Sequence, residues 1–370
     1  AEQTAAILFS SGSEGPPKGV MLSHRNIMAN LKQISDVLNT QDSDVVMASL
    51  PLFHAFGLTV TQFMPLIEGL PVVCHADPTD APNIGKAVAH YKATIICGTS
   101  TFLRLYTKNR KVHPLMFDSL RIVVAGAEKL NEQVRENFQL KFNKTIYEGY
   151  GATETTPVAS VNLPDALDTD YWEIQTGGKI GTVGMPLPGT SFKIIDPDSE
   201  QELATGEEGM IIIGGAQIMQ CYLNLPEQTA EVIRNIDGQR WYITGDKGRI
   251  DKDGFLTIID RYSRFAKIAG EMVGLGNVEQ NVKQALQTMG ETLKEEAEIL
   301  AVSIPDNDKG ERIILLSNIE IDAGTIKKTM LDARCNPLAI PHQFRRVEEI
   351  PKLGSGKTDF SQAKRLAMQT

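Results

Sequence analysis

The 370-residue chain has few cysteines and few aromatic residues, and it lacks both long apolar runs and an excess of positive charge. Its four cysteines (Cys74, Cys97, Cys221 and Cys335) lie far apart without a CxxC pair, which argues against a zinc site and favours free thiols in a reducing compartment. No segment reaches the roughly 18 apolar residues of a membrane helix, so we expect no membrane span. A net charge of −9 gives the chain no overall attraction for nucleic acid.

The composition is otherwise that of an ordinary globular protein, with 42% hydrophobic and 22% charged residues, and the length predicts two or three domains. Residues 1–177 alternate short apolar runs with helical patterns, which predicts a mostly parallel α/β sheet. Residues 178–261 carry short β runs between turn signals and predict an antiparallel β subdomain of the same large domain. Residues 262–370 predict a small α+β domain. The chain opens abruptly on an apolar run without a signal peptide, so we expect it to be a piece of a longer polypeptide.

Local patterns place the individual elements. Strands are expected at residues 6–9, 45–49, 72–74, 94–97, 122–124, 145–147, 192–195, 210–213, 255–259, 299–304, 313–316 and 344–348. The clearest helix is expected at residues 24–38, where apolar residues recur at helical spacing and Ser23 is a suitable N-cap.

A loop rich in glycine and serine follows the first expected strand and ends at Gly19. Its glycines let backbone N–H groups approach phosphate oxygens, its serines add donors, and Lys18 adds a positive charge. The candidate phosphate-binding residues are Ser10, Ser11, Gly12, Ser13, Gly15 and Lys18. The loop is not a Walker A motif, because Pro17 takes the place of the second glycine and Gly19 that of the hydroxyl residue.

The run ILFSSGSEGPPKGVMLSH resembles the phosphate-binding loop of the adenylate-forming enzymes, which include acyl-CoA synthetases, luciferases and the adenylation domains of peptide synthetases. Further motifs follow in the order of that family up to about residue 360. The resemblance implies ATP and Mg²⁺ as cofactors, and an acyl adenylate that a thiol then attacks. No GxSxG motif and no Cys/His signature of a covalent nucleophile is evident in the sequence.

Two motifs of the α/β part resemble the nucleotide site of the family. Residues 124–130 resemble the loop whose backbone lines the adenine, and residues 147–155 are the strongest internal signal of the resemblance. The binding residues carried over are Gly126, Ala127, Glu128, Tyr150 and Gly151. A tyrosine face can stack on adenine, Thr153 can donate to a phosphate, and Glu154 offers a hard oxygen ligand to Mg²⁺. We expect Glu154 to face a cleft beyond the carboxyl end of a strand, where open α/β sheets bind ligands.

Two further motifs concern the acyl group and the ribose. Residues 51–57 resemble the head of the acyl pocket, where His54 is expected as a gate or wall of the carboxylate site. Amino-acid-activating relatives carry an aspartate at that position, which argues against an amino-acid substrate. Asp246 lies in a segment that resembles the ribose motif, and its carboxylate can accept from both ribose hydroxyls. Arg261 would supply a fixed cation to the ribose or the α-phosphate.

The family joins its large and small domains just after that arginine. The hinge position holds Ser263 instead of the usual Asp or Lys, and serine tolerates the φ/ψ changes of a hinge. Residues 267–276 resemble the small-domain loop that enters the site for the thiol step and lines a tunnel for a pantetheine arm. Residues 351–357 resemble the loop with the adenylation lysine, which would be Lys357, although residues 358–360 depart from the usual Ile-x-Arg.

The segments DRYSRFAKIAGEMVGLGNVE and IPKLGSGKTDF resemble more particularly the acyl-acyl carrier protein synthetase domain of the bifunctional bacterial 2-acylglycerophosphoethanolamine acyltransferase. This resemblance implies a fatty acid substrate and the phosphopantetheine thiol of acyl carrier protein as acceptor. It also implies an upstream acyltransferase domain that reacylates a lysophospholipid, a large domain that is incomplete at its N-terminus, and a cytoplasmic location at the inner face of the bacterial inner membrane.

Two alternatives stay open, namely a long-chain fatty acid–CoA ligase and a noncatalytic adenylate-binding module. CoA and the carrier protein present the same pantetheine arm, so the choice between them depends on the mouth of the tunnel. An acidic carrier protein calls for a basic patch on the small domain. The candidate cations are Lys294, Lys327, Lys328, Arg345, Arg346, Lys364 and Arg365.

Overall fold

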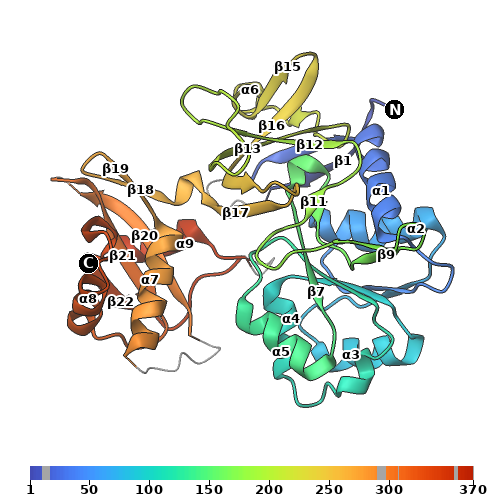
Figure 1. The fold of residues 1–370 in the computed structure, drawn as a ribbon, viewed down its shortest axis with the longest axis horizontal. Helices are drawn as coiled ribbons and strands as arrows, with labels where there is room; N and C mark the ends of the chain where they lie inside the picture. The colour runs from blue at the N-terminus through green and yellow to red at the C-terminus, as the bar shows by residue number, and fades with distance from the viewer. Residues whose placement is uncertain (11–16, 290–296, 307, 354–356, 370) are drawn as a thin grey trace. The chain divides into compact units, whose positions relative to one another are not determined.

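The computed structural model describes residues 1–10, 17–289, 297–306, 308–353 and 357–369 (Figure 1). The chain divides between Ile259 and Asp260 into two compact units, close to the boundary predicted after Arg261. Each unit has its own sheet and its own core.

The first unit contains a seven-stranded sheet with the order β11-β8-β7-β6-β5-β3-β4. The strands from β3 to β7 run parallel, whereas β8 and β11 run antiparallel to their neighbours. The strands are β3 (Val46–Ala48), β4 (Val72–Cys74), β5 (Ile95–Gly98), β6 (Ile122–Ala125), β7 (Ile146–Gly151), β8 (Val158–Val161) and β11 (Met185–Pro186).

Helices cover both faces of this sheet, because its central strands are apolar on both sides. Ile95 of β5 packs in one core cluster with Leu31 of helix α1, whereas its neighbour Ile96 packs in the opposite cluster with Leu103. Helix α1 spans the predicted residues, and the Ser23 side chain accepts the N–H of Asn26 as its N-cap. The first face carries α1 (His24–Leu38), the π-helix η1 (Phe56–Phe63) and α2 (Met64–Glu68). The second face carries α3 (Ala81–Tyr91), α4 (Ser100–Lys108), η2 (Pro114–Phe117) and α5 (Glu132–Phe142), and α3, α4 and α5 are seen side by side in Figure 1.

Antiparallel sheets complete the first unit. A small sheet has the order β1-β2-β14, with β1 (Thr4–Phe9), β2 (Gly19–Ser23) and β14 (Cys221–Tyr222). In the part of the chain predicted as an antiparallel β subdomain, a five-stranded sheet consists of β12 (Thr190–Ile195), β13 (Gly209–Gly215), β15 (Ile233–Ile236), β16 (Gln239–Ile250) and β17 (Leu256–Arg261). The remaining elements are the hairpin β9 (Ala166–Asp168) and β10 (Glu173–Gln175), the short helix η3 (Thr153–Thr155) and α6 (Pro226–Val232).

The second unit is a small α+β structure around a five-stranded sheet. The strands are β18 (Phe265–Ile268), β19 (Glu271–Gly274), β20 (Ile299–Asp306), β21 (Gly310–Ser317) and β22 (Gln343–Arg346). Helices α7 (Leu275–Thr288), α8 (Ala323–Asp332) and the short η5 (Pro337–Ala339) pack in one core cluster with the sheet. Helix α9 (Phe360–Met368) packs in a second core cluster. The short helix η4 (Tyr262–Arg264) precedes the sheet.

One predicted loop of the second unit is a hairpin. Residues 267–276, expected as a loop, contribute to β18, β19 and the first turn of α7. Ala269 and Gly270 connect the two strands with φ angles of 51° and 89°, the left-handed pair typical of a tight hairpin turn.

The α/β class with an antiparallel part and a small α+β part is confirmed by the sheets of the two units. No helix within the described ranges combines the length and the apolar character that crossing a membrane requires.

Candidate functional site

The residues predicted for the nucleotide follow neighbouring strands at the carboxyl edge of the parallel sheet. Gly126 follows β6, Gly151 ends β7, and these two strands pair directly. His54 precedes η1, and the Phe56 ring of η1 lies against Gly126, where an added Cβ would be 3.1 Å from the ring. The topology therefore brings three predicted segments to one edge, where open α/β sheets bind ligands.

The predicted adenine loop is held in an unusual backbone conformation. The N–H of Gly126 donates to Gly98 O at 3.1 Å, and Ala127 has a φ of 70°, a region that is costly for a residue with a Cβ. The Glu128 carboxylate accepts the N–H of Thr101 at 2.6 Å in the first turn of α4. The Glu128 side chain thus stabilises a helix N-terminus.

His54 stands at the start of η1 with its ring half-buried. Its Nδ1 accepts the N–H of Phe56 at 3.3 Å, and its backbone O accepts the N–H of Leu58 at 3.0 Å. The bond to Nδ1 orients the ring beside the residue that contacts Gly126. The role of His54 as a gate or wall of the carboxylate site stays a prediction.

The two ends of the predicted phosphate loop are joined to each other. Ser10 N donates to Lys18 O at 2.9 Å, and Lys18 N donates to Ser10 Oγ at 3.0 Å. The loop is therefore closed at its base, between β1 and β2. The other predicted members, Ser11, Gly12, Ser13 and Gly15, lie outside the described residues.

Glu154 is more enclosed than the cleft position expected for it. It is 8% exposed, and the Tyr222 hydroxyl donates to its Oε1 at 2.7 Å. Its backbone O accepts the N–H of Met219 at 2.8 Å. Both partners come from β14 and the segment before it, which cover η3. Tyr222 was not singled out from the sequence.

Tyr222 also contacts the predicted phosphate lysine. The Lys18 ammonium lies 4.8 Å from the centroid of the Tyr222 ring, within cation–π range. The hydroxyl of Tyr242 donates a hydrogen bond to Tyr222. Burial, and then the negative charge of Glu154, raise the pKa of Tyr222, so this tyrosine stays protonated as a donor.

A second tyrosine–carboxylate pair joins the predicted adenine and ribose residues. The Tyr150 hydroxyl donates to Asp246 Oδ2, and Asp246 is 5% exposed. The N–H of Asp246 donates to Thr244 Oγ1 at 3.0 Å. Burial raises the pKa of Tyr242 well above its usual value, and the negative charges of both carboxylates raise it further. Tyr242 therefore lies near both pairs. We call Tyr150, Glu154, Tyr222, Tyr242 and Asp246 the tyrosine–carboxylate cluster.

The donor set around Glu154 fits Mg²⁺ bound chiefly through a nucleotide. The described ranges hold no group of three or more His, Cys, Asp or Glu side chains suited to a metal ion. Mg²⁺ is commonly held by one or two carboxylates together with substrate phosphates and waters. Glu154 would be its carboxylate ligand, and Thr153 lies beside it at the start of η3.

The other predicted residues belong to the second unit. Arg261 ends β17, and Ser263 lies in η4. The backbone O of Lys357 accepts the N–H of Leu353 at 2.8 Å, just before α9 begins. The guanidinium of Arg264 lies 4.9 Å from the ring of Phe360, the first residue of α9.

Arg264 also forms an ion pair in the interior of the second unit. Its Nη2 donates to Glu279 Oε1 at 2.5 Å, and the second partner of that oxygen is the N–H of Ala301 at 2.8 Å. Burial raises the pKa of Glu279, and the charge of Arg264 opposes this rise. The segment that carries Lys357 is thus tied through Phe360 to a buried ion pair beside the predicted hinge.

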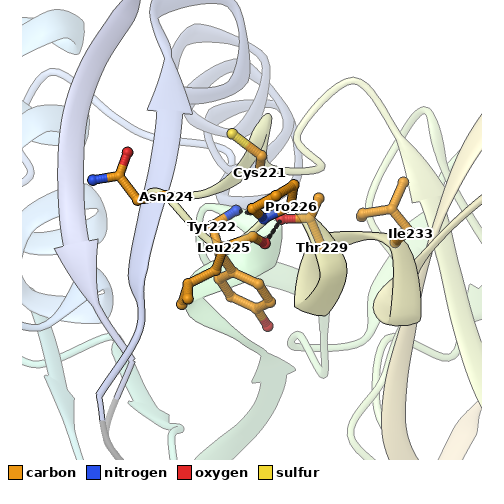
Figure 2. Close-up of a pocket in the computed structure, with 8 residues that line it drawn as sticks. Cys221, Tyr222, Asn224, Leu225, Pro226, Thr229 and Ile233 are labelled. Atoms are coloured by element: carbon orange, nitrogen blue, oxygen red, sulfur yellow. Dashed lines mark hydrogen bonds between the residues drawn. The ribbon is translucent and has the colours of Figure 1, made fainter.

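A separate hollow of about 470 Å³ is lined in part by Tyr222 (Figure 2). Its lining is almost entirely apolar. The lining residues are Cys221, Tyr222, Asn224, Leu225, Pro226, Thr229, Ala230 and Ile233. None of them was predicted as a site residue.

A glycine is required at position 151 because the backbone at Pro157 passes very close to it. A Cβ added at Gly151 would lie 1.8 Å from Pro157 O, a backbone atom that cannot move away alone. We expect Gly151→Ala to lower the free energy of unfolding by about 1–3 kcal/mol, measured by urea denaturation. Gly149→Ala on the same strand is the control, because its Cβ would lie 3.3 Å from Ser160 O. Equal losses in the two variants would contradict the steric argument.

Comparison with known proteins identifies the family. Residues 1–223 match the family described as AMP-binding enzyme. The long-chain-fatty-acid–CoA ligase of Salmonella typhimurium is 32% identical over 362 residues, which cover 96% of this chain and 60% of that protein. The ligase of the same name from Bacillus subtilis is 29% identical over 361 residues, covering 95% of this chain and 60% of that protein. This chain thus spans about three-fifths of the length of these relatives.

Solved structures share the fold. The crystal structure of ATP-bound MatB from Rhodopseudomonas palustris matches with a TM-score of 0.83 and 25% identity, covering 99% of this chain and 68% of that one. The O-succinylbenzoate CoA synthetase of Bacillus subtilis, in complex with ATP and magnesium ion, matches with a TM-score of 0.78 and 24% identity, covering 98% and 70%. The expected adenylate-forming fold is confirmed, and the chain belongs to the AMP-binding enzyme family.

Proposed function

We propose that the protein activates a fatty acid with ATP to an acyl adenylate and transfers the acyl group to a phosphopantetheine thiol. The observation that carries this proposal is the set of contacts around Tyr222 and Tyr150. These contacts join residues predicted for the phosphate, the metal, the adenine and the ribose, namely Lys18, Glu154, Tyr150 and Asp246. Tyr150 and Glu154 belong to one motif, whereas Lys18 and Asp246 come from distant parts of the sequence, and the fold brings both of these to the two tyrosines that carry the contacts.

The chemistry follows from the weakness of a carboxylate as an acylating agent, since its leaving group would be oxide. A carboxylate oxygen of the fatty acid attacks the α-phosphorus of ATP, the bond to the bridging oxygen breaks, and pyrophosphate leaves. The thiolate then attacks the acyl carbonyl carbon, and AMP leaves with the bonding electrons. Lys18 and Lys357 offset the negative charge that develops on the phosphates. Bound Mg²⁺ would supply further charge neutralisation there.

For the acceptor we propose acyl carrier protein, with the acyl group feeding lysophospholipid reacylation. This choice is supported by the resemblance of the sequences of residues 260–279 and 350–360 to the acyl-acyl carrier protein synthetase domain. Of the candidate cations on the second unit, Lys328, Arg346, Lys364 and Arg365 are exposed, and Arg346 also pairs with Glu320. Lys327 donates to His342 O. Lys294 lies outside the described residues. The alternative acceptor is CoA, which the names of the relatives favour.

The test is fatty-acid-dependent exchange of labelled pyrophosphate into ATP. We expect exchange that requires both a fatty acid and Mg²⁺, because pyrophosphate release is reversible while the acyl adenylate stays bound. ATP binding without exchange would favour the noncatalytic module.

A second arm of the experiment identifies the acceptor by comparing transfer to holo-acyl carrier protein and to CoA across an ionic-strength series. We expect a higher kcat/KM for the carrier protein, and a decline with salt because attraction between exposed charges is screened. A preference for CoA at every salt concentration would move the assignment to the CoA ligase.

A further inference from the structure

Tyr222 stands where two predicted ligand contacts meet. Its hydroxyl donates to Glu154 Oε1 at 2.7 Å, and the face of its ring carries the Lys18 ammonium at 4.8 Å from the centroid. Its side chain is buried, with 4% of the residue exposed. One neutral side chain thus touches both the predicted metal ligand and the predicted phosphate cation.

The surrounding structure fixes Tyr222 on several sides. Its N–H donates to Thr229 Oγ1 at 2.9 Å, and Thr229 in turn donates to Leu225 O at 2.8 Å, as Figure 2 shows. On β14, Tyr222 pairs with Val20 of β2, the strand that begins directly after Lys18. The hydroxyl of Tyr242 donates to the phenol oxygen. A side chain held this firmly can transmit its position to the groups that it touches.

The neutrality of the contact has a physical consequence. A lysine bonded directly to Glu154 would neutralise the carboxylate. This ion pair would have to break before the carboxylate could bind a metal ion or the ammonium could bind a phosphate. A phenol donor orients the carboxylate and leaves its negative charge in place. The ring attracts the ammonium through its quadrupole and leaves the positive charge in place. Both charges therefore stay available for ligands of opposite sign.

We propose that Tyr222 is a positioning residue that orients Glu154 toward the metal ion and Lys18 toward the phosphates of the nucleotide. The inference rests on the proposed function, in which Glu154 and Lys18 have these roles. It assigns separate tasks to the hydroxyl and to the ring. The two tasks can be separated by substitution.

The hydroxyl is tested by the affinity for Mn²⁺, a spectroscopic substitute for Mg²⁺, in the presence of α,β-methylene-ATP. Electron paramagnetic resonance of free Mn²⁺ gives the dissociation constant without any turnover. Loss of an outer partner of a metal ligand typically weakens metal binding about 10–100-fold, and we expect Tyr222→Phe to fall in this range. Tyr106→Phe is the control, because it removes another buried hydroxyl, one that bonds Ser49, and should leave the Mn²⁺ affinity unchanged.

The ring is tested by the affinity for metal-free ATP in EDTA, measured by equilibrium dialysis. Tyr222→Phe keeps the aromatic face and should bind metal-free ATP like the wild type, whereas Tyr222→Leu should bind it several-fold more weakly. Equal Mn²⁺ affinities of Tyr222→Phe and the wild type would overturn the role of the hydroxyl. Equal ATP affinities of the Phe and Leu variants would overturn that of the ring. Because both readouts need only binding, a wild-type protein that binds Mn²⁺ and nucleotide without fatty-acid-dependent exchange would overturn the proposed function alone.

Discussion

The Lys357→Ala protein is expected to form the acyl adenylate about 10²–10³ times more slowly than the wild type, the usual result of removing one positioned group that stabilises transition-state charge. Negative charge develops on the α-phosphate and the leaving pyrophosphate as the carboxylate attacks. The proposed role of Lys357 is to offset this charge. The rate of adenylation in a single turnover, measured by pyrophosphate release, gives the effect directly.

The loss should not come from unfolding of the second unit. The hydrogen bond between Leu353 N and Lys357 O and the bridge between Lys352 and Thr358 involve only main-chain atoms, which alanine retains. Lys352→Ala is a matched control from the same segment, because the ammonium of Lys352 is paired with Glu298 Oε1 at 2.5 Å. Lys352→Ala should therefore adenylate at nearly the wild-type rate.

The two half-reactions separate the role of Lys357 from a general loss of activity. The family resemblance assigns Lys357 to adenylation and residues 267–276 to the thiol step. Lys357→Ala supplied with preformed acyl adenylate should thus still make thioester at a rate close to that of the wild type. Equal damage to both half-reactions would contradict this division of labour.

Elements could be predicted from the sequence where the signal lies within the segment itself, as an apolar spacing or a cap does. Helix α1 and strand β4 match their predicted bounds, since the apolar spacing and the Ser23 cap of α1 are local signals. Strands β2 and β16 were missed. The former begins on Gly19, and the latter contains Gly245 and Asp246, residue types that disfavour strands by themselves. Both strands form because β1 and β13 supply the pairing, and a local pattern does not contain that information.

The candidate site shows the same limit. The motif order indicated Glu154, Tyr150 and Asp246, each on a glycine-rich segment after or within a strand. Tyr222 had no such signal, because it lies in a two-residue strand and meets Glu154 across 68 positions of sequence. The pairing of β14 with β2 brings it to the site. The same pairing explains why Glu154 is enclosed instead of facing an open cleft.

The Glu154→Gln protein is expected to adenylate about 10² times more slowly or worse, while its stability changes by about 1 kcal/mol or less. Glutamine has nearly the shape of glutamate, and its amide oxygen can still accept the Tyr222 hydroxyl, so the hydrogen bond survives the substitution. The substitution removes the negative charge, and Mg²⁺ therefore loses the hard anionic ligand that it prefers. Urea denaturation and the rate per folded molecule measure the two effects separately.

Two further variants decide between a chemical and a structural role for this carboxylate. Glu154→Ala leaves the buried Tyr222 hydroxyl without its acceptor and should cost about 1–3 kcal/mol of stability in addition to the rate. Glu148→Gln, on β7 of the same motif, weakens an ion pair with Arg135 and should lower stability while the rate per folded molecule stays near that of the wild type. If Glu154→Gln behaved like Glu148→Gln, with lost stability and intact turnover, Glu154 would be a structural residue, because a metal ligand cannot lose its charge without loss of rate.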